Sequence, residues 1–352
     1  MMRPSNGIGA GLWRRIKFAT MYHSMTPSVS RSTPDAFARA TRIAVGAALL
    51  ASLAALAPSA QAKPKDAAAS AADADPAGPH PVLDRIKSTG HIVLAHRQSS
   101  VPFAYYDANK QPIGFAVDLC KDIAEAVKKH LGLKTLTVDF VPDTTANRID
   151  LITSGKADLE CGTTTNNAER RQKVAFTIPH YITGSRYVVR ADSPISELDQ
   201  FDNHVLVSTA GSTQFKQIDQ ANRDRLMNIK VMEVADNAKA MAMVANGQAD
   251  GFAMDDVQLF GLIAESPDPK KYKVVGKFLT IEPLAIMLSK DDAAFKKVVD
   301  DEMRHLIRDG EGETLYDKWF MKPIPPKGVS MNLPMNYLLR DSWKYPSDIV
   351  GN

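Results

Sequence analysis

The sequence predicts an α/β fold of two lobes joined by two extended segments. Strand-like and helix-like segments alternate, which is typical of helices packed on a sheet. Residues 149–161 (IDLITSGKADLEC) and 241–254 (MAMVANGQADGFAM) both run from a helix through Gly-x-Ala-Asp into a short apolar strand, which suggests two lobes on one plan. The extended segments 181–190 and 282–290 flank the second copy. We therefore expect the second lobe to be an insertion in the first, with both crossings acting as a hinge.

The N-terminal segment predicts export. Residues 43–57 (IAVGAALLASLAALA) form an apolar run that follows Arg39 and Arg42 and precedes Ala60-Gln61-Ala62. A buried Ala-rich helix would explain the run but not the order of basic residues, apolar stretch and small-residue cleavage site. The run is also too short for a permanent membrane anchor. We expect residues 1–62 to contain a cleaved signal peptide and the protein to be periplasmic.

The mature chain is expected to be nearly neutral. Residues 1–62 hold seven of the 43 Lys and Arg and one of the 40 Asp and Glu, so 36 basic and 39 acidic residues remain, about −3 in net charge. A basic surface for nucleic acid is not indicated. Residues 63–81 are rich in Ala, Asp and Pro without periodicity, which predicts a disordered lead-in.

The lobes are assigned from the order of the elements. Residues 82–184 and 284–352 are expected to form lobe 1, and residues 185–283 lobe 2. The first strand is HIVLAH at 91–96, and a helix follows whose apolar residues recur every four positions up to Gly132. TLTVDFV at 135–141 alternates as a strand does.

The return to lobe 1 predicts a helix over 292–308 and a shorter one over 314–320. Pro323 to Pro326 is expected to end the helical part, leaving a tail with scattered apolar anchors such as Tyr337 and Trp343.

The sequence has two cysteines, Cys120 and Cys161. An oxidising compartment permits a disulfide between them, which would close a loop of about 40 residues. Two separately buried thiols are the alternative.

The polar run ECGTTTNNAERR at 160–171 has little to bury and is typical of a loop. Its hydroxyls and guanidinium could also hold a ligand. Arg170 begins a short helix, expected over 168–175, where free backbone N–H groups favour an anion. Arg97 follows a strand and Arg148 begins a helix, both in polar surroundings. Arginine suits carboxylate recognition because its planar fork is bidentate and stays charged.

Four segments carry a family resemblance: AHRQSSVPFAYYD (95–107), TANRIDLITSGKADLECGTTTNNAERRQKVAFT (145–177), FAMDD (252–256) and WFMKPIPPKGVSMN (319–332). They resemble the periplasmic glutamate/aspartate-binding proteins of ABC importers. The resemblance implies the type II periplasmic binding-protein fold, an amino acid enclosed between the lobes, and delivery to permease subunits by a monomer.

The resemblance also implies roles for single residues. Arg170 matches the position that grips the α-carboxylate of the ligand. Thr163 and Thr165 should bond the same carboxylate or the amino group, or cap the following helix. Asp255 matches the acceptor of the α-ammonium group.

The side-chain end of the ligand is implied to lie near Arg97 and Arg148, with Thr213 closing over the same carboxylate. At Asn237 the sequence departs from the family, which has a histidine there. An amide supplies no positive charge, so glutamine or asparagine becomes an alternative ligand. The two arginines favour an acidic ligand, since two buried guanidiniums facing a neutral amide would be costly.

An enzyme on the same fold, similar to a prephenate or cyclohexadienyl dehydratase, is the competing function. It would need an acid/base in the cleft. Glu160 is the nearest carboxylate, and no second catalytic partner is evident. The sequence shows no phosphate-binding glycine loop, metal-spaced cluster or nucleophile elbow, so we expect neither a cofactor nor a metal nor catalysis.

Overall fold

The computed structural model describes residues 81–350. The expected signal peptide at 1–62 lies outside the described residues, as does the expected lead-in apart from Pro81, which begins a helix. Within 81–350, no helix has the length and hydropathy needed to span a bilayer.

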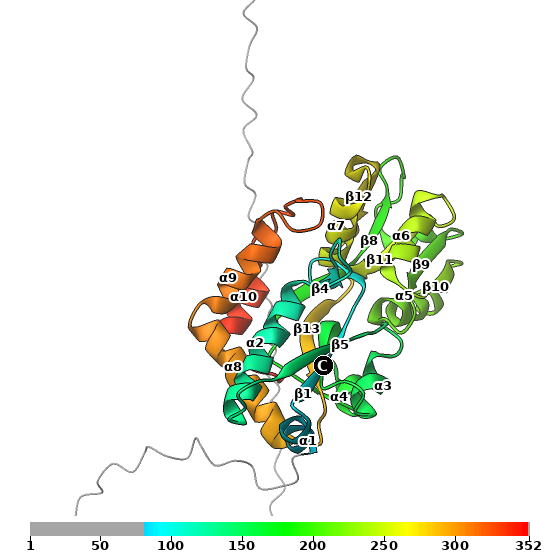
Figure 1. Ribbon diagram of the computed structural model, residues 1–352. Helices are drawn as coiled ribbons and strands as arrows, with labels where there is room; N and C mark the ends of the chain where they lie inside the picture. The colour runs from blue at the N-terminus through cyan, green and yellow to red at the C-terminus, as the bar shows by residue number, and fades with distance from the viewer. Residues whose placement is uncertain (1–80, 351–352) are drawn as a thin grey trace, which may run out of the picture. The chain divides into compact units, whose positions relative to one another are not determined.

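The first lobe is built on three parallel strands, β1 (His91–His96), β5 (Thr137–Pro142) and β6 (Leu159–Thr165). Its helices are α1 (Pro81–Thr89), α2 (Phe115–His130), α3 (Arg148–Thr153), α4 (Ala168–Arg171), α8 (Ala293–Arg308), α9 (Glu311–Tyr316), the π-helix η3 (Asp317–Met321) and α10 (Tyr337–Lys344). Its short strands are β2 (Ser99–Ser100), β3 (Ala104–Tyr106), β4 (Pro112–Ile113) and β7 (Ala175–Phe176). Helices α2, α8 and α9 pack against one another beside this sheet (Figure 1).

The second lobe repeats the parallel plan with β9 (Val205–Thr209), β10 (Lys230–Val234) and β11 (Gly251–Asp255). The rest of it comprises η1 (Leu198–Phe201), α5 (Thr213–Asp224), α6 (Asn237–Ala245), α7 (Asp256–Glu265), η2 (Pro269–Lys271) and β12 (Tyr272–Val275). Each lobe therefore has its own helix-covered parallel strands, as the two copies of the Gly-x-Ala-Asp pattern predict.

Two long strands join the lobes, β8 (Tyr181–Arg190) and β13 (Ile281–Leu288). They pair antiparallel over 181–184 and 281–284. Beyond that point β8 pairs with β11 and β12, while β13 pairs with β6 and β7. The sheet order is β10-β9-β11-β8-β13-β6-β1-β5. The expected α/β fold of two lobes with two crossings is confirmed, and the lobe boundaries given above stay a prediction.

The end of the chain differs from the expectation. Helix formation does not stop at Pro323 to Pro326, because α10 follows and buries Leu339 and Trp343 against the first-lobe core. Tyr337, an expected anchor, is 72% exposed. The expected helix over 314–320 is instead a short α-helix followed by a π-helix.

The polar run is also more ordered than a loop. Strand β6 continues past Cys161 to Thr165 because β13 pairs with Thr164 and Thr165. Helix α4 ends at Arg171, four residues earlier than the expected end. Asn167 caps α4, since its side-chain oxygen accepts the Arg170 N–H at 2.9 Å.

Cys120 on α2 and Cys161 on β6 form a disulfide that links chain positions 41 residues apart. The bond ties the long helix of the first lobe to the strand that carries the threonine run. It lies within the first-lobe core.

Candidate functional site

A polar cavity lies between the lobes, at the carboxyl ends of parallel strands from both. It is lined by Arg97, Thr145, Arg148, Thr163 and Thr165 of the first lobe and by Ser212, Thr213, Gln214, Met254, Asp255 and Gln258 of the second. In open α/β sheets, ligands bind beyond the carboxyl ends of the strands. The space measures about 220 Å³, and all the residues that line it except Thr213 are buried. The lining side chains have closed on one another, so an amino acid can enter only if the lobes separate.

Arg170 connects the two lobes beside this cavity. Its Nη1 donates to the carbonyl of Thr165 at 2.9 Å, and its Nη2 donates to the carbonyl of Gly211 in the other lobe at 3.4 Å. A Cβ at Gly211 would lie only 3.1 Å from the Cα of Ala146, so the absence of a side chain permits this approach. The exposed pair Glu169 and Lys216, 2.7 Å apart, spans the same gap. These contacts describe a closed arrangement of the lobes.

Burial lowers the pKa of Arg170, whereas the nearby acids Glu282, Glu160 and Asp255 raise it. Since a desolvated cation favours a nearby anion, Arg170 is suited to hold a carboxylate. Its own donors are directed to backbone carbonyls in this closed form.

Arg148 is buried and its Nε has no hydrogen-bond partner among the described residues. Burial lowers the pKa of Arg148 to about 9, and the nearby Arg170 adds to the effect. A buried guanidinium with an unused donor is costly unless an anion reaches it. Arg148 therefore offers the cavity a buried guanidinium with one unused donor, while the nearby Glu160 and Asp143 favour its charged form.

Arg97 is paired within the protein. Its Nε lies 3.3 Å from Oδ1 of Asp143, and both side chains are almost fully buried. Burial and the neighbouring Glu160 raise the pKa of Asp143 to about 8, against the opposing effect of Arg97 and Arg148. Whether the positive charge of Arg97 is neutralised thus depends on the protonation of Asp143, a residue that the sequence analysis did not single out.

The threonine run divides its side chains between the two faces of β6. Thr163 and Thr165 line the cavity, while the hydroxyl of Thr164 donates to Oε2 of Glu160 at 2.6 Å. The side chain of Glu160 lies over Gly162 of the same strand. A Cβ added at Gly162 would lie only 2.1 Å from Oε1 of Glu160. The glycine therefore makes room for a buried carboxyl group beside Arg97.

Asp255 at the end of β11 is held by two amides. Gln214 Nε2 donates to its Oδ1 at 2.8 Å, and Gln258 Nε2 donates to its Oδ2 at 2.7 Å. Burial raises its pKa well above the ordinary range, Glu282 adds to this, and the Gln258 bond opposes it. An ammonium group placed here would restore the carboxylate, which makes Asp255 a fitting partner for an amino group.

Asn237 is brought near the site but does not line the cavity. It is fully buried, accepts from the Thr209 hydroxyl at 2.8 Å and donates to Gln258 Oε1 at 2.9 Å. Its position is therefore behind Gln258, which in turn holds Asp255. The structure gives it no direct access to the ligand space.

Thr213 lines the cavity as the first residue of α5, and its hydroxyl donates to Glu282 Oε2 at 3.2 Å. Glu282, in the crossing strand β13, also accepts from Gln217 and Thr280. Thr213 is thus linked to the hinge as well as to the cavity.

Sequence reasoning missed several lining residues: Thr145, Ser212, Gln214, Met254 and Gln258. Ser212 could have been found from STQF, because it caps α5 by accepting the Phe215 N–H at 3.1 Å. Gln214 and Gln258 lie in the first turns of α5 and α7, and nothing in the local sequence distinguishes them from solvated glutamines.

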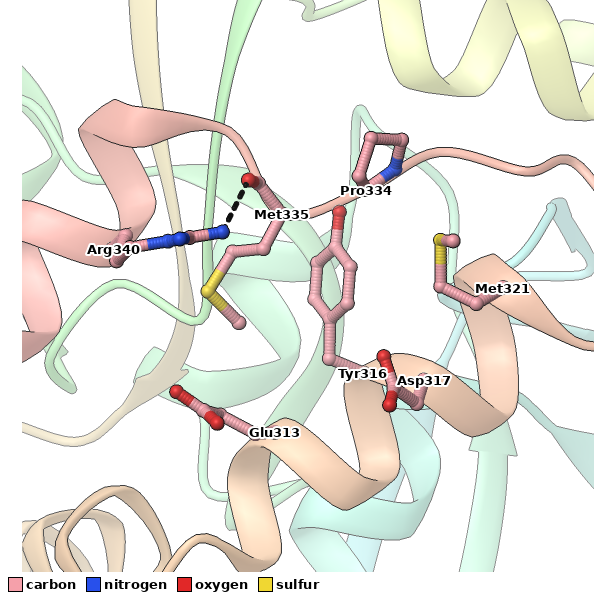
Figure 2. Close-up of a pocket in the computed structure, with 7 residues that line it drawn as sticks. All are labelled: Glu313, Tyr316, Asp317, Met321, Pro334, Met335 and Arg340. Carbon is pink, nitrogen blue, oxygen red and sulfur yellow. Dashed lines mark hydrogen bonds between the residues drawn. The ribbon is translucent and has the colours of Figure 1, made fainter.

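A second cavity lies wholly in the first lobe, lined by Glu313, Tyr316, Asp317, Met321, Pro334, Met335 and Arg340 (Figure 2). It is larger, about 660 Å³, yet its single guanidinium donates to the backbone carbonyl of Met335. Its two carboxylates would repel an acidic ligand. None of the residues expected to bind ligand lies there.

Comparisons with known proteins identify the family of the chain. The family model for bacterial extracellular solute-binding proteins, family 3, matches residues 92–322. A glutamate/aspartate import solute-binding protein of Escherichia coli (strain K12) is 37% identical over 284 residues, which cover 81% of this chain and 94% of that protein. An L-glutamate/L-aspartate-binding protein of Pseudomonas aeruginosa is 38% identical over 267 residues, covering 76% and 88%.

Among solved structures, the solute receptor for L-cysteine of Neisseria gonorrhoeae is 26% identical, with a TM-score of 0.61, over 70% of this chain and 96% of that one. The match to the family model extends over most of the described residues, and both sequence relatives exceed 30% identity. This chain therefore belongs to the bacterial extracellular solute-binding proteins, family 3.

Proposed function

We propose that this protein captures an acidic L-amino acid, glutamate or aspartate, between its lobes and delivers it to the permease of an ABC importer. The observation that carries the proposal is the convergence of Arg97, Arg148 and Arg170 with Asp255 around one interlobe cavity. An acidic amino acid has two carboxylates and one ammonium group, so it needs an excess of cations over anions. The names of the two bacterial sequence relatives support the same ligand class.

The α-amino-acid part of the ligand would be held by three groups. Arg170 would take the α-carboxylate, with the hydroxyls of Thr163 and Thr165 beside it. Asp255, already oriented by Gln214 and Gln258, would take the α-ammonium group.

The side-chain carboxylate would then lie toward Arg97 and Arg148. Arg148 has an unused donor, and Thr213 closes this end from the second lobe. Asn237 would hold Gln258 in place through a hydrogen bond and would not itself contact the ligand.

Transport requires the permease to distinguish the closed protein from the open one. The crossings β8 and β13 provide a two-strand hinge, and the contacts of Arg170 with Gly211 and of Glu169 with Lys216 form only when the lobes are closed. We propose that the protein acts as a monomer in the periplasm after removal of a signal peptide.

The related proteins reported above are binding proteins rather than enzymes, which supports binding over dehydration chemistry. Calorimetric titration of ligand-stripped protein with glutamate, aspartate, glutamine and asparagine tests the proposal. Micromolar or tighter binding of the acidic pair is expected. Absence of binding to all four, together with turnover of prephenate, would overturn it.

A further inference from the structure

Asp143 is a buried acid beside Arg97 that the proposed ligand contacts leave unused. It lies at the start of the loop after β5, 2% exposed, with its backbone N–H bonded to the carbonyl of His96 at 2.9 Å. Neither of its carboxyl oxygens accepts a conventional hydrogen bond from a described donor. Its Oδ1 lies 3.3 Å from Arg97 Nε, within ion-pair distance.

The groups facing Asp143 come from three further elements. Glu160 of β6 adds a second buried carboxyl group, and Arg148 of α3 and Arg97 after β1 add positive charges. His96 is also nearby, but its Nδ1 is turned to the carbonyl of Arg97 and burial lowers its pKa, so it stays neutral. Because two neighbouring buried carboxylates repel each other, Glu160 favours a proton on Asp143.

Whether the positive charge of Arg97 is neutralised depends on the protonation of Asp143. When Asp143 is ionised, it neutralises Arg97 and places a negative charge beside the end of the cavity where the ligand side chain would lie. When Asp143 is protonated, Arg97 is free to attract a ligand carboxylate. Glu160 and burial both favour the protonated form, whereas Arg97 and Arg148 favour the ionised one.

We infer that Asp143 is a specificity-determining residue whose protonation is coupled to the binding of an acidic ligand. The inference rests on the proposed function. An acidic amino acid adds a carboxylate near Arg97 and takes the place of Asp143 as its counter-ion, so the complex retains a proton on Asp143. A neutral amide ligand adds no charge there and leaves the proton equilibrium of Asp143 unchanged. Discrimination between glutamate and glutamine then depends on pH.

The sign of the pH dependence follows from linkage. The complex with glutamate holds the proton more tightly than the free protein does, so affinity for glutamate falls as pH rises through the pKa of Asp143 in the free protein. That pKa is raised into the neutral to alkaline range by burial and by Glu160. The ratio of the glutamine to the glutamate dissociation constant should therefore fall about tenfold between pH 7 and pH 9. Because both ligands carry an α-amino group of similar pKa, its own titration largely cancels in the ratio.

The experiment is calorimetric titration of wild type, Asp143→Asn and Asp150→Asn with glutamate and glutamine at pH 7, 8 and 9. Asp143→Asn keeps the shape of the side chain and cannot titrate, so the ratio should become independent of pH. Asp150→Asn is the matched control, because Asp150 is exposed on α3 and makes the same change in net charge. Repeating the glutamate titration at pH 8.5 in buffers of different ionisation enthalpy should show proton uptake in wild type and in Asp150→Asn but not in Asp143→Asn.

A flat ratio in wild type, or a pH-dependent ratio that persists in Asp143→Asn, would overturn the inference while leaving acidic-ligand binding intact. Glutamine binding without glutamate binding at pH 7 would instead refute the acidic ligand of the proposed function. Failure of every amino acid to bind would refute the proposed function altogether. Far-ultraviolet circular dichroism and thermal unfolding establish that each variant is folded, and the proton-uptake measurement on wild type needs no variant.

Discussion

The side-chain amide of Asn237 donates a hydrogen bond of 2.9 Å to Oε1 of Gln258. This bond fixes which end of the Gln258 amide faces Asp255, because Gln258 can donate through Nε2 only while its Oε1 is turned toward Asn237. Asn237 is thus a residue that orients the cavity wall.

We predict that Asn237→Ala weakens glutamate and glutamine binding to a similar extent, by about 1–3 kcal/mol, because Gln258 and the Thr209 hydroxyl both lose a partner. Calorimetric titration measures both affinities. Asn246→Ala, at the exposed end of the same helix, serves as the control and should bind as wild type does. A loss confined to glutamate would mean that Asn237 senses the ligand side chain directly.

Arg170→Lys should weaken every amino-acid ligand at least about 30-fold, which corresponds to about 2 kcal/mol. Lysine keeps the charge but cannot reach Thr165 and Gly211 together or hold a carboxylate bidentately. The neighbouring Arg171, which donates to Asn166 at 2.9 Å, provides the matched Arg171→Lys control. If both variants bound glutamate equally well, Arg170 would not be the α-carboxylate group.

Arg97→Ala should reduce glutamate affinity at least about tenfold more than glutamine affinity. Removing the cation removes a group that favours the ionised form of Asp143, so Asp143 stays protonated at pH 7 and does not itself repel the ligand. The exposed Arg223 on α5 provides the control, Arg223→Ala. Equal losses for glutamate and glutamine would contradict the placement of the ligand side chain beside Arg97.

The disulfide should contribute to stability rather than to binding. Replacing Cys120 and Cys161 together by alanine should lower the free energy of unfolding by about 4 kcal/mol, the value that the chain-entropy model gives for a loop of this length. Urea denaturation measures the change. A reductant should shift the midpoint of wild type but not of the double variant, and an unchanged midpoint in both would show that the cross-link adds nothing.

His180 should make the protein less stable in acid. It is fully buried and packs against Phe103 and Phe115, and burial lowers its pKa to about 3, against an opposing effect of the nearby Gly162 backbone. The unfolded chain binds a proton at this histidine below about pH 6.5 and the folded chain does not, so stability is lost as pH falls. Between pH 7 and pH 5 the loss from His180 should be about 2 kcal/mol.

Urea unfolding of wild type, His180→Leu and His91→Gln at both pH values isolates this contribution. His180→Leu should lack it, while the variant of the exposed His91 should retain it. An identical pH dependence in wild type and His180→Leu would assign the acid sensitivity to other groups.

Some features could be predicted from local sequence because local rules govern them. The apolar periodicity of 115–131 gave α2 almost to the residue, and strand alternation separated Thr163 and Thr165 from Thr164. The end of β6 was misplaced, because pairing with β13, about 120 residues away in the chain, extends it to Thr165. Helix α10 was missed since Leu339 and Trp343 are too few to form a periodic pattern without the surface they cover.

The amino-acid sequence by itself predicted the α/β class, the two-lobed plan and three arginines that suit a carboxylate, since these follow from periodicity, an internal repeat and residue chemistry. The role of Asp255 was implied by the family resemblance. Only the tertiary structure decided which polar groups meet. It joined Cys120 to Cys161, placed Asn237 behind Gln258, and set Asp143 against Arg97. Hydrogen bonds and ion pairs act over a few ångströms, and residues from separate elements come that close only once the sheet has brought them together.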